Sequence, residues 1–93
     1  MLVTLWREPE FRFMKCVVRF FGPAVELCGK SDRAYDLAPG ATLGALAGQI
    51  AVDYPRLGAA VGVRLAVNHH YVPLDRELQD GDEVAVIPPV AGG

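Results

Sequence analysis

The segment from Thr42 to Pro55 carries the clearest helical pattern of the chain, and short β-rich runs lie on both sides of it. Thr42 is a favourable N-cap, and Pro55 lacks the N–H that would continue the helix. Gly44 and Gly48 each cost about 1 kcal/mol relative to Ala, so this helix depends on docking against other elements. Its apolar residues recur at helical spacing at Leu43, Leu46, Ala47, Ile50 and Tyr54. The pattern predicts one main helix packed across a sheet.

The segment before this helix predicts two strands joined by a short helical stretch. Alternation over residues 16–21 separates two sets of side chains. The core set is Cys16, Val18 and Phe20, and the solvent set is Val17, Arg19 and Phe21. Residues 23–28 begin with a proline and are followed by Gly29, which predicts one or two helical turns. Residues 33–37 form the second predicted strand.

Three further β-rich segments follow the helix, at residues 63–67, 71–72 and 83–87. The sequence Asn68-His69-His70 predicts the first turn between them, and Asp80-Gly81-Asp82 predicts the second. In the last strand, Val84 and Val86 point inward, whereas Glu83, Ala85 and Ile87 point outward. With residues 71–72 counted as the short return of the strand before them, the order β-β-α-β-β fits a β-grasp fold of the α+β class, with a mixed sheet and one main helix.

The chain is expected to form one domain over residues 14–87, with an N-terminal extension at residues 1–13 and an extended, flexible tail at residues 88–93. The extension mixes charges and scattered aromatic side chains without a clean period. It is either a poorly ordered segment, or translation starts at Met14 and the extension is not native. The alternative is an added edge strand or a partner contact through Trp6 and Phe11.

Composition excludes several classes of function. A hydrophobic content of 52% supports a real core, and a net charge of −2 gives no reason to expect binding to nucleic acid or to an anionic membrane. No apolar run approaches the roughly 20 residues of a membrane span, and no signal peptide is recognised, so a cytoplasmic protein is expected. Cys16 and Cys28 are then reduced thiols, and no metal site is expected because ligand-spaced Cys and His are too few.

The sequence ends in Pro88-Pro89-Val90-Ala91-Gly92-Gly93, directly after the last predicted strand. The prolines keep this segment extended, and the final glycines add no side-chain bulk. At about 3.3 Å per residue, the six residues reach roughly 20 Å, enough to enter a partner's pocket. A terminal carboxylate with a pKa near 3.5 is ionised and inert, so it needs activation, for example as an acyl-adenylate that a sulfur nucleophile can attack.

Several motifs resemble the sulfur-carrier subunit of molybdopterin synthase. The resemblance covers about residues 14–93, and its most specific parts are the terminal PPVAGG and the turn from Leu78 to Val84. It implies a ubiquitin-like fold in which Gly93 is adenylated and then converted to a thiocarboxylate. Gly92, Ala91, Val90, Pro89 and Pro88 would form the tail that enters the partner. It also implies molybdenum cofactor biosynthesis, with sulfur donated to a cyclic pyranopterin precursor.

The same resemblance implies the partners of the chain. These are the large catalytic subunit of molybdopterin synthase, in a heterotetramer, and a ubiquitin-activating-type adenylyltransferase that consumes ATP. A sulfurtransferase or a cysteine desulfurase would be the sulfur source. The chain itself binds no cofactor and is not an enzyme alone, because it has no catalytic triad and no phosphate-binding glycine loop. The family's apolar contact patch maps onto Phe21, Tyr71 and Ile87, and large apolar side chains on a solvent face often mark a partner site. The alternative is that residues 1–13 cover this face.

Other candidate residues are weaker. His69 and His70 are adjacent on a turn, without a third ligand, and are interpreted as turn residues. Cys16 is expected to be an inert core residue and Cys28 to be more exposed, with a redox or persulfide role left as an alternative. Five carboxylates around the second turn form either a solvated rim or a surface that steers a basic partner. They are Asp75, Glu77, Asp80, Asp82 and Glu83.

Three alternative functions stay open at this stage. The first is a sulfur carrier for thiazole synthesis in the thiamine pathway, or for another sulfur pathway. The second is a ubiquitin-like protein modifier that is joined through Gly93 to lysines of its targets. The third is a binding module whose sheet surface acts while its tail is idle.

Overall fold

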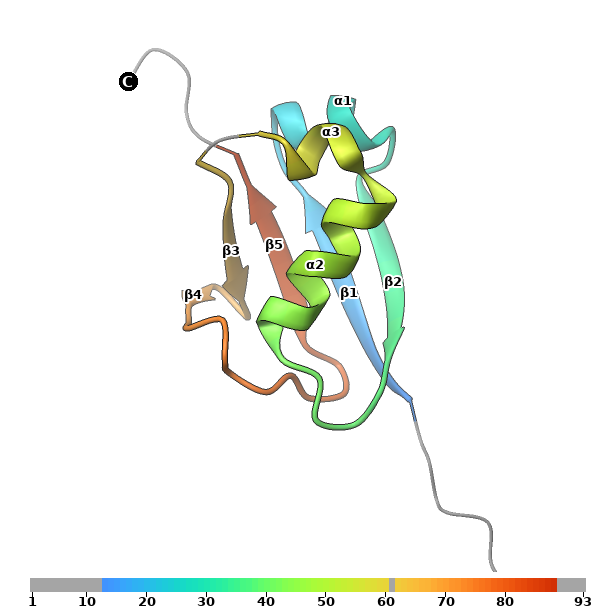
Figure 1. Cartoon of the computed structure of the whole chain (residues 1–93), viewed down its shortest axis with the longest axis vertical. Helices are drawn as coiled ribbons and strands as arrows, with labels where there is room; N and C mark the ends of the chain where they lie inside the picture. Colours follow the sequence, from blue (N-terminus) through green and yellow to red (C-terminus); the bar gives the residue numbers. More distant parts are fainter. Residues whose placement is uncertain (1–12, 61, 89–93) are drawn as a thin grey trace, which may run out of the picture.

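The computed structural model describes residues 13–60 and 62–88, which form a five-stranded sheet with a helical layer over one face (Figure 1). The strands are β1 (Met14–Phe20), β2 (Asp32–Leu37), β3 (Arg64–Val67), β4 (His70–Tyr71) and β5 (Glu83–Ile87). The helices are α1 (Pro23–Cys28), α2 (Leu43–Asp53) and α3 (Pro55–Gly58). The predicted mixed sheet with one main helix packed across it is confirmed.

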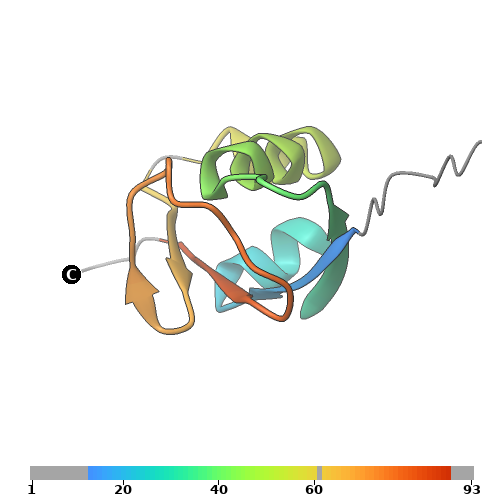
Figure 2. The same ribbon diagram turned by 90° about the horizontal axis from the view of Figure 1, so that it is seen from below.

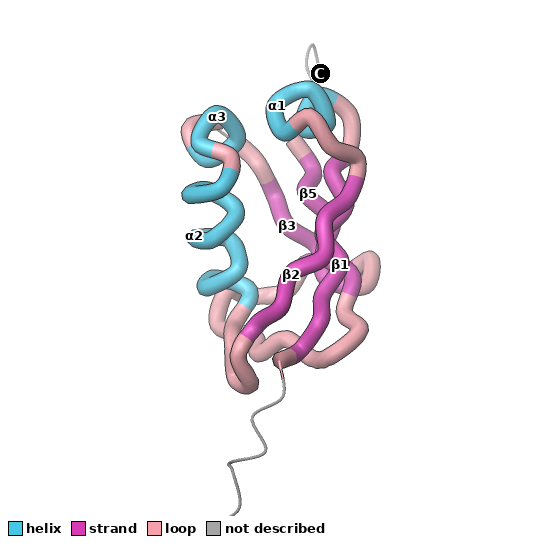
Figure 3. The backbone as a smooth tube through the Cα atoms, turned by 90° about the vertical axis from the view of Figure 1, so that its right-hand side faces the viewer, coloured by secondary structure: helices cyan, strands magenta, loops and turns pink. Residues whose placement is uncertain are grey.

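The sheet has the strand order β2-β1-β5-β3-β4. Its two central strands, β1 and β5, run parallel, while β2 and β3 pair antiparallel to them on either side. The parallel pair joins segments far apart in the sequence, with Val18 opposite Val84 and Phe20 opposite Val86. Seen from below, α2 and α3 lie in a layer above the strands (Figure 2), and the side view shows α2 running alongside the sheet (Figure 3).

Helix α2 begins as the sequence predicts. The Thr42 hydroxyl accepts a hydrogen bond from the Ala45 N–H at 3.1 Å, which satisfies one free donor of the first turn. The Gly44 N–H donates to the Leu74 carbonyl at 2.8 Å, and a Cβ at position 44 would lie 3.2 Å from that oxygen. Glycine at this position therefore lets the loop before β5 approach the helix closely, a benefit that offsets its low helix propensity.

The core lies between α2 and the inner face of the sheet. Residues of both layers are fully or almost fully buried, which confirms the predicted alternation in the first and last strands. The largest of its completely buried side chains are Leu43, Leu46, Val18, Val67, Val84, Val86 and Cys16. The ring of Phe20 meets Tyr54 edge to face, with centroids 5.3 Å apart. Burial of these apolar groups supplies the main driving force for folding.

A polar cluster ties the end of α2 to β2. The Asp53 carboxylate accepts hydrogen bonds from the Tyr35 hydroxyl at 2.7 Å, from Arg33 at 3.0 Å and from the Gln49 amide at 3.0 Å. The Tyr35 hydrogen bond is the main reason that the pKa of Asp53 is lowered. The Arg33 guanidinium also stacks on the Tyr35 ring, 4.4 Å from its centroid. This cluster thus joins the last turn of α2 to β2 through side chains.

Several predicted boundaries are wrong by one residue, and one element was missed. Strand β3 begins at Arg64 rather than Val63, and the return strand is His70–Tyr71 rather than 71–72. Asn68 and His69, with φ of 49° and 71°, make the turn alone, so His70 already belongs to the strand. Pro55 ends α2 as predicted but also begins the short helix α3, because its fixed φ suits a first helical position.

Candidate functional site

The outward face of the sheet, opposite α2, carries the three predicted contact residues. Inward residues Val84 and Val86 are completely buried, so their neighbour Ile87 lies on the opposite face. Phe21 follows β1 and its N–H donates to the Val86 carbonyl at 3.3 Å, which places it beside the end of β5. Tyr71 lies on the same face because register partners share a face of the sheet. Tyr71 of β4 is opposite Ala66 of β3, and Ala66 is opposite Ala85, an outward residue of β5.

These side chains differ in their exposure to solvent. Phe21 is 48% exposed and Tyr71 is 55% exposed, whereas Ile87 is half-buried. By strand order, Ile87 lies between the other two, because β5 is flanked by β1 and β3. Isolated exposed aromatic residues are common, but two on one face with an isoleucine between them form an apolar patch. Phe21, Tyr71 and Ile87 are referred to below as the apolar patch.

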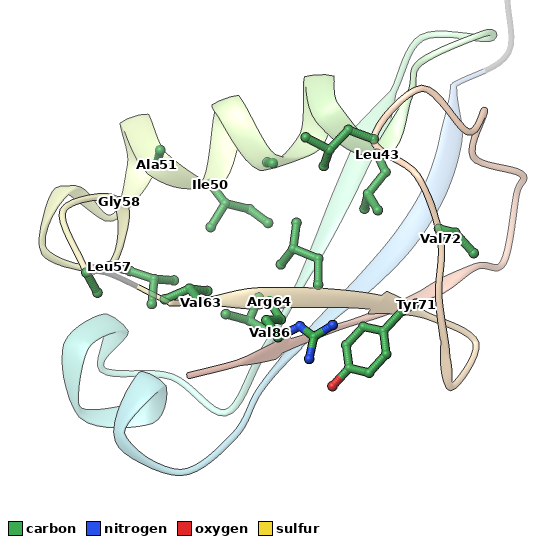
Figure 4. A pocket seen from close by; sticks show the side chains of 14 residues that line it. Leu43, Ile50, Ala51, Leu57, Gly58, Val63, Arg64, Tyr71, Val72 and Val86 are labelled. Atoms are coloured by element: carbon green, nitrogen blue, oxygen red, sulfur yellow. The ribbon is translucent and has the colours of Figure 1, made fainter. Parts of the chain in front are cut away.

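Two arginines border the apolar patch, and the sequence pattern alone predicts a contact role for neither. The Arg19 Nε lies 3.2 Å from the Glu83 carboxylate on the neighbouring strand. The Arg64 guanidinium lies over the Tyr71 ring, 4.2 Å from its centroid, as Figure 4 shows. Strand alternation places Arg64 on the same face as Ala66, two residues further along β3. Alternation does not indicate which side chain Arg64 contacts.

The hairpin that presents Tyr71 is held by a buried carboxylate. Asp82 is only 6% exposed and accepts hydrogen bonds from the Asn68 amide at 2.8 Å, the Gln79 N–H at 2.8 Å and Arg76 at 3.2 Å. Asn68 in turn accepts from the Glu83 N–H at 3.0 Å. The β3–β4 turn, the loop before β5 and the start of β5 are thus joined at one carboxylate.

The prediction of a solvated rim at the second turn is therefore wrong for Asp82. Burial by itself would raise the pKa of this carboxyl, but its hydrogen bonds from Gln79, Asn68 and Arg76 outweigh that effect and lower the pKa. The other carboxylates of the cluster are exposed or half-buried. Of these, Glu83 pairs with Arg19, and Asp80 accepts a hydrogen bond from the Lys15 N–H at 2.8 Å.

The tail begins at the end of the central strand β5, next to Ile87 of the apolar patch. Strand β5 ends at Ile87, and the half-buried Pro88 follows it. A Cβ at Gly22 would lie 3.9 Å from the Pro88 ring, so the loop after β1 passes close to the beginning of the tail. Gly93, Gly92, Ala91, Val90 and Pro89 lie outside the described residues, as do Trp6 and Phe11 of the extension.

Within residues 13–60 and 62–88, the remaining candidate residues do not gather into a group that could hold a metal ion. His69 and His70 are exposed at the hairpin. Cys16 is completely buried, as predicted, and Cys28 is only half-buried at the end of α1. Burial raises the pKa of both thiols, which keeps them protonated and poorly nucleophilic. The geometry therefore gives no support for a chemical role of the two histidines or of the two cysteines.

A groove of about 480 Å³ separates α2 and α3 from β3 and the segment after β4 (Figure 4). Its lining is mostly apolar, with Ile50 and Ala51 on the helical side and Val63 and Val72 on the other. The sequence pattern did not predict it, because no local signal reports the gap between two packed elements.

None of the helices within residues 13–60 and 62–88 combines the length and the apolar character that a membrane span requires.

The fold places the chain among the ubiquitin-like β-grasp proteins. It is similar to the solved structure of a ubiquitin from Caldiarchaeum subterraneum, with a TM-score of 0.60 at 21% identity over 87% of this chain and 99% of that one. At this identity the similarity concerns the fold alone. A structure from Pyrococcus furiosus assigned as molybdopterin converting factor subunit 1 is more similar, with a TM-score of 0.78 at 32% identity. The match covers 83% of this chain and 99% of that chain.

Sequence comparison is more specific. The ThiS family matches residues 18–93. The molybdopterin synthase sulfur carrier subunit of Mycobacterium tuberculosis is 42% identical over 82 residues, which cover 86% of this chain and 99% of the relative. The protein of the same name from Chlamydomonas reinhardtii is 39% identical over 83 residues, covering 86% and 100%. The chain therefore belongs to the family of molybdopterin synthase sulfur carrier subunits.

A solved structure from Helicobacter pylori bears on the assembly of such proteins. It is a protein–protein complex of subunits 1 and 2 of molybdopterin-converting factor. The present chain matches one of its chains with a TM-score of 0.62 at 30% identity, over 86% of this chain and 100% of that one.

Proposed function

We propose that this chain carries sulfur on Gly93 for molybdopterin synthesis. The observation that carries the proposal is the junction of the apolar patch with the exit of the tail, at the end of β5. A partner that docks on Phe21, Tyr71 and Ile87 would receive the chain next to Pro88, from where the tail extends into the partner. Membership in the sulfur-carrier family supports the same assignment, and its match extends to residue 93.

The chemistry has two steps at the terminal carboxyl group. In the first, the carboxylate of Gly93 attacks the α-phosphate of ATP on an activating enzyme, forming an acyl-adenylate and releasing pyrophosphate. In the second, a persulfide supplied by a sulfurtransferase or cysteine desulfurase attacks the acyl carbon and displaces AMP, which forms an acyl disulfide. A second thiol then cleaves the S–S bond, so that Gly93 leaves as a thiocarboxylate and the two thiol sulfurs are joined in a disulfide. Adenylation is needed because an ionised carboxylate is a poor electrophile. The chain contributes the reacting group and its delivery, and the enzymes contribute catalysis.

The partner that consumes the thiocarboxylate is proposed to be the large catalytic subunit of molybdopterin synthase. The Helicobacter pylori complex of subunits 1 and 2 supports a partner of this kind. In its active site, the thiocarboxylate sulfur would attack the cyclic pyranopterin precursor and form a thioester with it. Water would then hydrolyse the acyl–sulfur bond, which leaves the sulfur on the precursor and regenerates the carboxylate of Gly93. A heterotetramer of two small and two large subunits and a cytoplasmic location complete the proposal.

Intact mass spectrometry tests the proposal directly. The chain is incubated with ATP, the activating enzyme and a sulfur source, and the expected mass change is the replacement of one oxygen by sulfur. A matched variant with one extra alanine after Gly93 should keep the same urea unfolding midpoint and acquire no sulfur. If the extended variant gains sulfur as the native chain does, or if the native chain gains none, Gly93 is not the carrier residue.

A further inference from the structure

The outward sheet face carries two guanidinium groups with different electrostatic surroundings. Arg19 is neutralised within the chain, because its Nε lies 3.2 Å from the Glu83 carboxylate. Arg64 lies instead over the Tyr71 ring at 4.2 Å. Within the described ranges, no carboxylate oxygen comes within 4 Å of the Arg64 guanidinium. Among the described residues, Arg19 thus has a carboxylate partner and Arg64 has none.

Stacking leaves the hydrogen-bonding edge of Arg64 free. A guanidinium that lies on an aromatic ring uses its flat face for that contact, and its N–H donors point outward in the plane of the group. A carboxylate matches this fork of donors, and the resulting charge-assisted hydrogen bonds are among the stronger ones in proteins. The ring also restricts the side chain before binding, so less conformational entropy is lost when a partner arrives.

The position of Arg64 connects it with the proposed interface. Arg64 is the register partner of Ile87, the last residue of β5 before the tail begins. Its ring partner Tyr71 is itself a member of the apolar patch, and Figure 4 shows both side chains on the side of β3 away from α2. A protein that covers the apolar patch must therefore also cover, or pair with, the Arg64 charge.

Leaving this charge unpaired in an interface would oppose binding. A guanidinium that loses water without gaining a partner carries a large desolvation cost, whereas a facing carboxylate removes that cost and adds specificity. The same argument does not apply to Arg19, whose charge is already compensated by Glu83 before any partner binds. The structure thus distinguishes one arginine that requires a complementary partner from one that does not.

We propose that Arg64, stacked on Tyr71, is a specificity-determining residue of the docking face, and that the large synthase subunit presents an Asp or Glu carboxylate to it. This inference rests on the proposed function, because the partner is the large subunit. The carboxylate pairs with Arg64 while the apolar patch is buried around it. The pairing selects partners that carry an acidic side chain at this place.

Binding of the chain to its purified large subunit, followed by isothermal titration calorimetry at several salt concentrations, tests the inference. Arg64→Gln should weaken binding roughly ten- to a hundredfold, the range expected for loss of a charge-assisted contact, and should flatten the salt dependence. Arg64→Lys should recover part of the affinity, since it keeps the charge but loses the fork. Arg19→Gln is the matched control on the same face and should change affinity less than about threefold. Urea unfolding of each variant verifies the fold.

Charge reversal identifies the facing group. Arg64→Glu should abolish binding, and one Asp or Glu to Arg substitution in the large subunit should restore it. Wild-type affinity for Arg64→Gln, or equal losses for Arg64→Gln and Arg19→Gln, would overturn the inference. It is also overturned if removal of residues 92–93 erases the difference between Arg64→Gln and the native chain, because Arg64 then pairs with the chain's own tail. These measurements need no sulfur on Gly93, so a failure of the proposed sulfur chemistry is seen separately by mass spectrometry.

Discussion

The two faces of the sheet differ in burial and charge, and this difference fits the proposed division between a stabilising face and a partner-binding face. On the inner face, Val84 and Val86 are completely buried beneath α2, and their surroundings are almost entirely apolar. On the outward face of β5 are Glu83, Ala85 and Ile87, the residues that alternate with the two valines. Exposed aromatic side chains and two arginines lie around them. The inner face contributes free energy of folding, whereas the outward face keeps apolar area in solvent at the expense of that free energy. Such a difference is expected when one face is kept for a partner.

The strongest test of this difference is a pair of truncations. Leu46→Ala removes a completely buried side chain under the helix and should lower the free energy of unfolding by about 3 kcal/mol, through lost burial and a residual cavity. Phe21→Ala on the outward face should cost less than about 1 kcal/mol but weaken partner binding more than about tenfold. Urea denaturation and calorimetry measure the two effects. Similar stability losses for both variants would contradict the separation of roles.

The buried carboxylate at the hairpin gives the next largest effect. Asp82→Ala leaves the Asn68 amide, the Gln79 N–H and Arg76 without their acceptor, and should lower the free energy of unfolding by about 2 kcal/mol. Asp75→Ala, an exposed carboxylate of the same loop region, is the control and should change it by less than about 0.5 kcal/mol. If the two variants are equally stable, Asp82 does not hold the hairpin that presents Tyr71.

The same carboxylate predicts a pH dependence. The pKa of Asp82 is lower in the folded chain than its ordinary value of 3.8, so the ionised carboxylate stabilises the folded state relative to the unfolded state. Its contribution is therefore fully present above about pH 5 and is lost as the pH falls through 4 towards the folded pKa. Asp53, whose pKa is also lowered, adds to this loss. Urea midpoints between pH 7 and pH 3 should fall less steeply for Asp82→Asn than for the native chain, and an unchanged slope would refute the assignment.

The smallest expected effect compares two glycines of α2. A Cβ at Gly48 meets no atom within 4 Å, so Gly48→Ala should stabilise the chain by about 1 kcal/mol through better helix propensity. Gly44→Ala places its Cβ 3.2 Å from the Leu74 carbonyl and should gain nothing, or lose stability. Thermal unfolding followed by circular dichroism measures both. Equal gains would show that the loop before β5 moves away from the helix without cost.

Much of the fold was predictable because its signals are local. Thr42 caps the helix with its own side chain, and Gly29 ends α1 with a φ of 73°. Alternation over residues 16–20 and 83–87 assigned the buried side correctly: Cys16, Val18, Phe20, Val84 and Val86 are all buried. The candidate patch was predicted because Phe21 and Ile87 fall on the solvent side of their strands, while Tyr71 required the resemblance to a known family. The chemistry at Gly93 remains a prediction from sequence and family.

Other features depended on contacts between distant parts of the chain. Nothing in the residue types separates Asp82 from its exposed neighbour Asp80, because the difference is made by Asn68, fourteen residues away in sequence. Nor does a lone Arg64 indicate that its cation lies on Tyr71 instead of on a carboxylate. The sequence by itself determined the main helix, the strands and the buried sides of the first and last strands, since backbone propensities and side-chain periodicity act over a few residues. The tertiary structure alone decided which charges are paired, because burial and distance arise only when β1, β3 and β5 come together.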